Sequence, residues 1–364
     1  MSRRLVLHVG AMKSGTSYVQ SRLFANKRML AERGILVPGM NWLSQVMAAR
    51  DVLGSGEAQW AKMAGKVQAH EGTSVISMEY LGPVRPVVVR RVLASFPDHE
   101  VTVVVTARDL NRSIAAMWQE TVQNGRTWTF ADYLAGIEAW RPGHRDESAE
   151  PPESGRTFWR QQNIVRFART WGEEVGAANV VVVTVPPPGA PRELLWERFC
   201  SVLGTSPDGF APARMGNESV GAASTLVIRR VNELLNDEGL VFPEGTELRK
   251  GVLAKQVLAA RKKEEPAIGL PVAPWVVDHA GHMVSALDEL GVSLVGSWSD
   301  LTPVDVPGVD PATVSPTLVA DAAIAGLAGV LAEQIRLAGA GSSDSSDPSD
   351  SSDDVDDLDD GGSG

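Results

Sequence analysis

Residues 4–17 constrain this chain more than any other stretch, because an apolar run passes through two glycines directly into a helical pattern. Residues 5–9 read Leu-Val-Leu-His-Val, which predicts a short buried strand. Gly10 and Gly15 frame the turn that follows, and apolar residues recur at helical spacing after Thr16. The backbone N–H groups of such a turn converge, and the helix dipole favours an oxyanion there. The stretch therefore predicts a strand, a phosphate-binding loop and a helix start.

The lysine of this loop is displaced from its position in nucleotide triphosphatases. Their loop reads G-x-x-x-x-G-K-[ST], in which the lysine contacts the β- and γ-phosphates and the hydroxyl holds magnesium. Gly10 and Gly15 fit this spacing, but Thr16 stands where the lysine would be, and the lysine of this chain is Lys13. The displacement moves the fixed positive charge across the loop, toward a different group of the ligand.

Strand and helix patterns alternate along most of the chain. Strands are predicted at residues 5–9, 73–79, 101–106 and 179–185, with a short extended segment at 35–38. Helical patterns cover residues 16–33, 42–53, 58–70, 85–96, 109–122, 128–137, 158–175, 191–203, 219–240, 248–263 and 276–290, and an exposed loop is predicted at 141–156. Continuous valine-rich strands are typical of a parallel sheet that is covered on both faces. We therefore expect an α/β fold of the P-loop-like, three-layer type, in which helices flank a central parallel sheet and the C-terminal part is rich in helices.

Chemistry-bearing residues follow three of the predicted strands. The Lys13 loop follows the first, Glu79 the second and Arg108 the third. Ligands of such sheets bind beyond the carboxyl ends of the strands, so these residues are expected to lie close together. Glu79 is a candidate general base, with a helix-capping or surface role as the alternative. Arg108 offers a fork of donors to a phosphate, and the alternative is an ion pair with Asp109 or a neighbour.

The segment Lys13-Ser14-Gly15-Thr16-Ser17 resembles the 5′-phosphosulfate loop of the sulfotransferases, which runs Lys-(Ser/Thr)-Gly-Thr-(Thr/Ser). That family takes its sulfuryl group from 3′-phosphoadenosine 5′-phosphosulfate (PAPS) and needs no metal. The resemblance implies that Lys13 neutralises the leaving oxygen, that the 5′-phosphate is held by Ser14, Gly15, Thr16 and Ser17, and that Tyr18 packs on the adenine. A core position in the first helix is the alternative for Tyr18.

The family's 3′-phosphate site is matched only in part. In sulfotransferases an arginine at a strand end and a serine eight residues later grip this phosphate. Arg108 matches the arginine, but the serine position holds Ala116, and Ser113 lies on the same helix face. Arg214, in Arg214-Met215-Gly216, matches an Arg-x-Gly element near the 3′-phosphate, although the Gly-x-Trp-Lys that accompanies it elsewhere is missing.

The catalytic base is left open between two residue types. Some carbohydrate-modifying sulfotransferases have a glutamate at this strand end, in a context that Ser77-Met78-Glu79 resembles, and others use a histidine. His8 is the histidine nearest the loop in sequence, with packing inside the sheet as its alternative. Arg108-Asp109-Leu110 with Trp118-Gln119-Glu120, and the segment 290–303, resemble sulfotransferases of bacterial, actinobacterial type. The leading hypothesis is a PAPS-dependent sulfotransferase of this type, acting on a hydroxyl or amine of a small molecule, glycan or lipid. A P-loop kinase or NTPase, and an inactive nucleotide-binding relative, are the alternatives.

Charge and cysteine content exclude several other classes. The net charge is −11, but residues 341–364 hold nine aspartates and no lysine or arginine, so the remaining 340 residues carry only −2. A nearly neutral body does not indicate a nucleic-acid surface. Cys200 is the single cysteine, which excludes an internal disulfide and a cysteine-based zinc site.

The C-terminal part divides into two segments after a sulfotransferase-like domain at residues 1–304. Residues 305–340 form a helical extension, in which an Ala- and Leu-rich pattern predicts a helix over 311–338, and residues 341–364 form a disordered acidic tail. Asp321, Glu333 and Arg336 argue against a membrane span, and we expect the helix to dock on the body, with a surface for a partner as the alternative. The N-terminal apolar run is too short for a secretory signal, so a cytoplasmic protein is expected.

Overall fold

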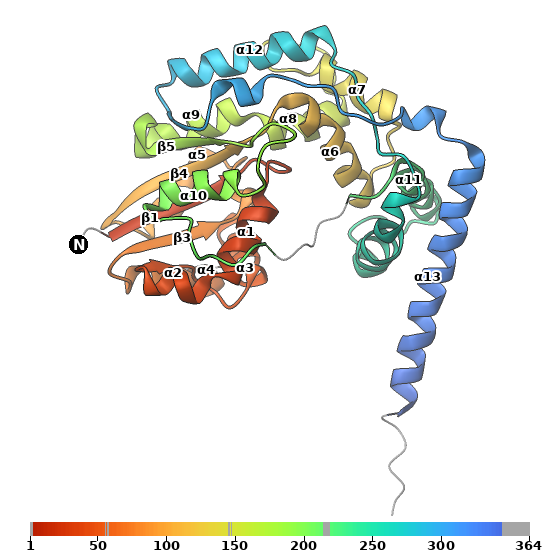
Figure 1. The fold of residues 1–364 in the computed structure, drawn as a ribbon, viewed down its shortest axis with the longest axis horizontal. Helices are drawn as coiled ribbons and strands as arrows, with labels where there is room; N and C mark the ends of the chain where they lie inside the picture. Colours follow the sequence, from red (N-terminus) through yellow and green to blue (C-terminus); the bar gives the residue numbers. More distant parts are fainter. Residues whose placement is uncertain are drawn as a thin grey trace, which may run out of the picture.

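The computed structural model describes residues 3–343, except 55, 57, 145, 147 and 214–218, and is built around one sheet of six parallel strands (Figure 1). Its strand order is β2-β3-β1-β4-β5-β6. The strands are β1 (Arg3–Gly10), β2 (Ile35–Leu36), β3 (Thr73–Ser77), β4 (His99–Ala107), β5 (Val180–Thr184) and β6 (Ser293–Val295). Because β1 lies between β3 and β4 and all neighbours are parallel, their carboxyl ends meet at one edge.

Helices account for most of the remaining chain. They are α1 (Thr16–Ala25), α2 (Lys27–Glu32), α3 (Trp42–Leu53), α4 (Ala58–Gln68), α5 (Pro86–Ala94), α6 (Leu110–Gln123), α7 (Phe130–Ala139), α8 (Glu153–Gln162), α9 (Ile164–Val175), α10 (Leu194–Leu203), α11 (Ala222–Asp237), α12 (Pro274–Glu289) and α13 (Pro316–Ser343). Short 3-10 elements are η1 (Glu79–Leu81), η2 (Ala177–Asn179), η4 (Ala259–Lys263), η5 (Trp298–Leu301) and η6 (Pro311–Thr313), and η3 (Glu247–Leu258) is a π-helix.

Alternating side chains of β1 anchor two different cores. Leu5, Leu7 and Val9 are fully buried with residues of α3, α4, α5 and α9 on one face of the sheet. Val6 points to the other face, where it packs with residues of α1, α2 and α10. This alternation follows from the two-residue period of a strand. Helices thus cover both faces of a central parallel sheet, which confirms the predicted α/β fold with three layers.

A third core lies among helices beside the sheet. Trp118 on α6, Tyr133 on α7 and Phe158 on α8 are fully buried there, together with residues of α11 and η3. Helix α11 and η3 belong to the helix-rich C-terminal part that the sequence predicts, whereas α6, α7 and α8 come from earlier in the chain. Helix α6 follows β4 directly and joins this helical region to the sheet. Side chains of α6 and η3 can therefore reach the same edge of the sheet as the Lys13 loop.

The predicted helix boundaries are wrong at two asparagines. The helix expected over residues 16–33 is two helices separated at Asn26, whose side chain donates to the Arg22 carbonyl (2.8 Å) and accepts from the Ala211 backbone (2.7 Å). The helix expected over 158–175 is likewise split at Asn163, which caps α9 by accepting from the backbone N–H of Arg166 (2.9 Å). Asparagine favours such caps because its short side chain competes for backbone groups.

Two further elements differ from the prediction. Helix α8 begins at Glu153, inside the segment predicted as a loop over 141–156. Strand β6 was not predicted, because its three residues give too short an apolar pattern and only its pairing with β5 defines it.

Helix α13 runs along the outside of α11 and continues beyond it (Figure 1). It begins at Pro316 rather than residue 311, and it reaches Ser343. Its residues 316–338 are long and apolar enough to cross a membrane by length and composition alone, with 11% of the most apolar window buried inside the protein. Nearly all of the acidic segment that the sequence places at 341–364 lies outside the described residues.

Candidate active site

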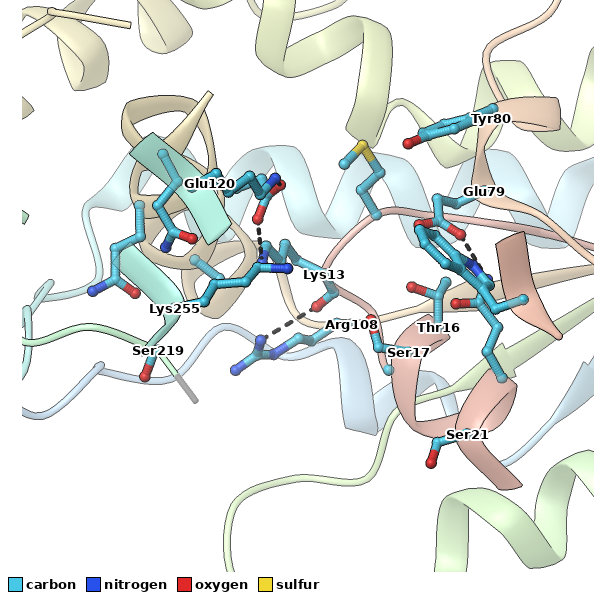
Figure 2. A pocket seen from close by; sticks show the side chains of 18 of the residues that line it. Lys13, Thr16, Ser17, Ser21, Glu79, Tyr80, Arg108, Glu120, Ser219 and Lys255 are labelled. Carbon is cyan, nitrogen blue, oxygen red and sulfur yellow. Dashed lines mark hydrogen bonds and ion pairs between the residues drawn. The ribbon is translucent and has the colours of Figure 1, made fainter. Parts of the chain in front are cut away.

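A cavity of about 580 Å³ opens where β1, β3 and β4 end. Lys13, Glu79 and Arg108 all line it, so the three strand-end residues lie together as the sheet topology predicts (Figure 2). Its other lining residues are Met12, Gly15, Thr16, Ser17, Gln20, Ser21, Phe24, Trp42, Tyr80, Ala116, Gln119, Glu120, Gln123, Ser219, Lys250 and Lys255. Four cations and two carboxylates among these side chains give the cavity a net positive charge, which suits an anionic ligand.

The loop after β1 needs glycine at both of its ends. Gly10 has φ +97° and Gly15 has φ +82°, in the left-handed region that favours glycine. A Cβ on Gly10 would lie 2.9 Å from the Cβ of Glu79, and a Cβ on Gly15 would lie 2.5 Å from Leu195 Cδ2. The two glycines therefore let the loop lie directly against the end of β3 on one side and α10 on the other.

A buried chain of hydrogen bonds ties the loop to the sheet. His8 Nδ1 lies 2.7 Å from Ser77 Oγ and its Nε2 lies 3.1 Å from Thr106 Oγ1, which in turn lies 2.7 Å from Ser14 Oγ. Burial lowers the pKa of His8 to about 3, so the imidazole is neutral at pH 7. His8 thus fits the sheet-packing alternative, and it does not line the cavity.

The first turn of α1 presents backbone donors to the cavity. Gly15 is the N-cap, and among the described residues no side chain caps this end of the helix. Thr16 and Ser17 follow it on the cavity wall. Uncapped N–H groups and the positive end of the helix dipole together form an anion site, the feature on which the predicted phosphate loop depends.

Arg108 contacts the Lys13 loop through its guanidinium group, which has further N–H donors for a ligand. Its Nη1 donates to the Lys13 carbonyl (3.3 Å), and its buried Nε has no partner in the described part of the chain (Figure 2). Burial and the nearby Arg112 charge lower the pKa of Arg108 to about 10, although Asp109 opposes the shift, so the guanidinium remains charged at pH 7. Asp109 pairs with Arg112 instead, and its side chain caps α6 by accepting from the backbone N–H of Arg112.

Glu79 is the first residue of η1, directly after β3. Its Oε2 accepts a hydrogen bond from Gln20 Nε2 on α1 (2.8 Å), which fixes the orientation of the carboxylate in the cavity (Figure 2). The backbone N–H of Met78 donates to the His8 carbonyl (2.8 Å), so the strand pairing continues up to the residue before Glu79. A carboxylate held in this way can accept a proton from a bound hydroxyl.

The Lys13 ammonium is held by a carboxylate for which the sequence analysis predicted no role in the site. Lys13 Nζ lies 2.7 Å from Glu120 Oε2, and Lys250 Nζ lies 2.7 Å from Glu120 Oε1. Burial alone would raise the pKa of Glu120, but the charges and hydrogen bonds of the two lysines outweigh it and lower the pKa to about 2. The Lys250 ammonium also donates a hydrogen bond to Asn124 Oδ1 (2.7 Å) at the C-terminal end of α6, which ties this η3 side chain to α6.

Several predicted site residues lie elsewhere. Ser14 and Ser113 are buried and do not line the cavity, whereas Ala116 does. Tyr18 packs against the core beside α10, which fits its alternative interpretation as a core residue. Arg214 lies outside the described residues.

The charged cavity residues that sequence analysis missed come from helices far from the loop in sequence. Glu120 lies on α6, and Lys250 and Lys255 lie on η3. Spacing on α6 indicates only that Glu120 lies one turn beyond Ala116, on the same face of the helix. No sequence signal marks the two lysines, because their place depends on how η3 packs against α6.

Comparisons with known proteins give little further information. No protein-family model matches the chain, and no curated protein matches it. A crystal structure of a sulfotransferase from Alicyclobacillus acidocaldarius is similar over 60% of this chain and 87% of that chain, with 17% sequence identity and a TM-score of 0.39. Because the similarity is this low, function must be inferred from the residues of the cavity.

Proposed function

We propose that this chain is a sulfotransferase that moves a sulfuryl group from PAPS to a hydroxyl or amine of a small molecule, glycan or lipid. The observation that supports it most is the convergence of the uncapped α1 N-terminus, Lys13, Arg108 and Glu79 on one cavity. The first three suit a polyanionic nucleotide, and the fourth is a base beside it.

The residues present fit such a donor. The N–H groups after Gly15, with the Thr16 and Ser17 hydroxyls, would hold the 5′-phosphate. Arg108 would bind the 3′-phosphate, because its buried Nε has no acceptor within the described part of the chain and Asp109 is already paired with Arg112. Ala116 offers no hydrogen bond at the expected serine position, so Arg108 carries more of this contact.

The reaction requires that the acceptor loses a proton and that the departing 5′-phosphate oxygen gains negative charge. PAPS supplies a sulfuryl group whose bond to the 5′-phosphate breaks as the acceptor oxygen or nitrogen bonds to sulfur. Glu79 would take the acceptor proton while Gln20 keeps the carboxylate in place. Lys13 would leave Glu120 and stabilise the negative charge on the departing phosphate oxygen.

The position of the lysine favours this function over a kinase or NTPase. Thr16, not lysine, follows Gly15 at the start of α1. The ammonium of Lys13 is instead directed toward α6 and Glu120 (Figure 2). A lysine at that side of the loop does not take the β/γ-phosphate position of a Walker A lysine.

Ligand-induced thermal stabilisation tests the donor. We expect 3′,5′-bisphosphoadenosine to raise the melting temperature in the presence of EDTA. At a ligand concentration of 100 times Kd, the free energy of unfolding should increase by about 2.7 kcal/mol. The variant Arg108→Ala should lose most of this shift, and Arg85→Ala, at the N-cap of α5, should keep it. Stabilisation by ATP with magnesium, without any effect of the bisphosphate, would support the NTPase alternative.

Transfer of radiolabelled sulfate from PAPS to a panel of alcohols, amines, glycans and lipids tests the reaction. We expect a labelled product with at least one acceptor class, and product formation with Lys13→Ala that is slower by about 10²- to 10³-fold. Tight binding of PAPS without transfer to any class would instead support the inactive nucleotide-binding alternative.

A further inference from the structure

Helix α13 carries a stripe of large aliphatic side chains that no part of the described chain covers. Ile324, Leu327, Leu331 and Ile335 are between 52% and 71% exposed. They follow one another at intervals of three, four and four residues, which places them on one side of a helix. With Ala320 and Ala338 at its two ends, we call this set the outer stripe.

The outer stripe lies opposite the side on which α13 packs. Ala322 is fully buried, and a Cβ on Gly329 would lie 2.4 Å from Val257 on η3, so small residues form the inner side. At about 100° per residue, Leu331 lies roughly half a turn around the helix from Ala322. Near Ala322 and Gly329 the inner side therefore packs on α11 and η3, whereas Leu337 near the end of the helix is 56% exposed. The outer stripe is apolar and uncharged over about 27 Å, the rise of 18 residues.

The charges around the outer stripe disfavour a lipid surface as its partner. Helices that bind membrane surfaces carry lysine and arginine on the polar side. Arg336 is the one cation in residues 316–364, and it pairs with Glu333 at 2.9 Å. Nine aspartates follow in 344–360, which an anionic lipid surface would repel. The packed inner side, with Gly329 against Val257, also cannot face lipid while α13 stays on the body.

We propose that the outer stripe binds the outer stripe of a second copy of this chain, with the two α13 helices antiparallel. A two-fold axis pairs one surface with itself, so a single apolar stripe suffices for a closed dimer. Intervals of three and four residues are those of interlocking helices. The antiparallel direction follows from charge, because parallel helices would bring two sets of nine aspartates to the same end, whereas antiparallel helices separate them.

The oligomeric state of the full chain tests the pairing. We expect sedimentation equilibrium to give twice the chain mass at micromolar concentration. The variant Leu331→Glu should raise the dissociation constant at least about a hundredfold, since the dimer loses two buried leucines and gains two like charges. The matched control Ala332→Glu adds the same charge on the same helix beside the stripe, at an exposed position, and should remain dimeric. Circular dichroism should give equal helix content for all three proteins.

Cysteine cross-linking tests the direction. Cys200 is buried, so an introduced thiol is the reactive one. In the antiparallel pair, residue 320 of one copy faces residue 338 of the other. A mixture of Ala320→Cys and Ala338→Cys proteins should therefore form a disulfide-linked dimer on mild oxidation, and neither protein alone should do so.

Three results would overturn the proposal. The first is a wild-type chain that stays monomeric at all concentrations tested, and the second is cross-linking of each cysteine variant with itself, which indicates parallel helices. The third is flotation of a monomeric wild type with phosphatidylcholine or phosphatidylserine vesicles that Leu331→Glu abolishes, which would assign the outer stripe to a membrane. Loss of the dimer by Leu331→Glu leaves the PAPS-binding proposal untouched, because Leu331 is not among the residues that line the cavity.

Discussion

The two walls of the cavity are positioned by different physical means. The strand wall, made of Lys13, Glu79 and Arg108, follows directly from three adjacent parallel strands. The helix wall, made of Glu120, Lys250 and Lys255, depends on how α6 packs with η3, more than a hundred residues apart in sequence. A sheet fixes where its strand ends lie. We therefore expect residues of the strand wall to act directly on the ligand, and residues of the helix wall to modulate the charge and position of Lys13.

The largest effect should come from the proposed base on the strand wall. Glu79→Gln keeps an acceptor for Gln20 but removes the proton acceptor, and we expect kcat to fall about 10²- to 10⁴-fold. A sulfate-transfer assay at saturating acceptor measures this. The matched change Glu100→Gln, at an exposed position near the opposite end of β4, should leave kcat unaltered. Equal kcat values for Glu79→Gln and the wild type would show that Glu79 is not the base.

A somewhat smaller effect is expected at Lys13. Lys13→Ala removes the charge that stabilises the leaving phosphate oxygen, so kcat/KM should fall about 10²- to 10³-fold. The control Lys66→Ala, on the exposed side of α4, should retain full activity. Steady-state rates with varied PAPS decide the outcome, and a change confined to KM would show that Lys13 binds the donor without stabilising the transition state.

Glu120 should make stability depend on pH. Its folded pKa is about 2 against an ordinary 4.5, so its stabilising contribution is complete above pH 4.5 and is lost as pH falls toward 2. Between these pH values the wild type should lose on the order of 2 kcal/mol more unfolding free energy than Glu120→Gln. Urea titrations at each pH measure this, with the exposed Glu32→Gln as a control that should follow the wild type. Parallel curves for all three proteins would contradict the Lys13–Glu120–Lys250 cluster.

The smallest effect should come from Lys250 on the helix wall. Without Lys250, Glu120 keeps Lys13 as its ion-pair partner and holds it more firmly, so activity should fall only about tenfold. Glu120→Gln combined with Lys250→Ala should restore most of this loss, and the exposed Lys262→Ala should have no effect. A double variant as weak as Lys250→Ala alone would mean that Lys250 acts directly on a ligand and not through Glu120.

Sequence patterns predict those parts of the molecule that depend on local periodicity. The alternation within β1 and the valines of β4 indicate a sheet covered by helices on both faces. Residues that follow adjacent parallel strands lie at the same edge of the sheet, so Lys13, Glu79 and Arg108 could be predicted to lie together. Asn26 and Asn163 interrupt helices through hydrogen bonds between their side chains and backbone groups, and the spacing of apolar residues does not reveal such bonds. Lys250 could not be assigned, because nothing in a π-helix at residues 247–258 indicates which distant carboxylate it meets.

The way the loop is enclosed bears on how quickly a ligand can be captured. Glu79 lies against Gly10, Leu195 lies against Gly15, and Ser14 is bonded to Thr106, so these contacts restrain the loop backbone at both ends and at Ser14. The entropy of ordering this segment is lost during folding and not on encounter. Association should therefore proceed in a single kinetic phase whose rate rises linearly with donor concentration, without a plateau set by a slow conformational step.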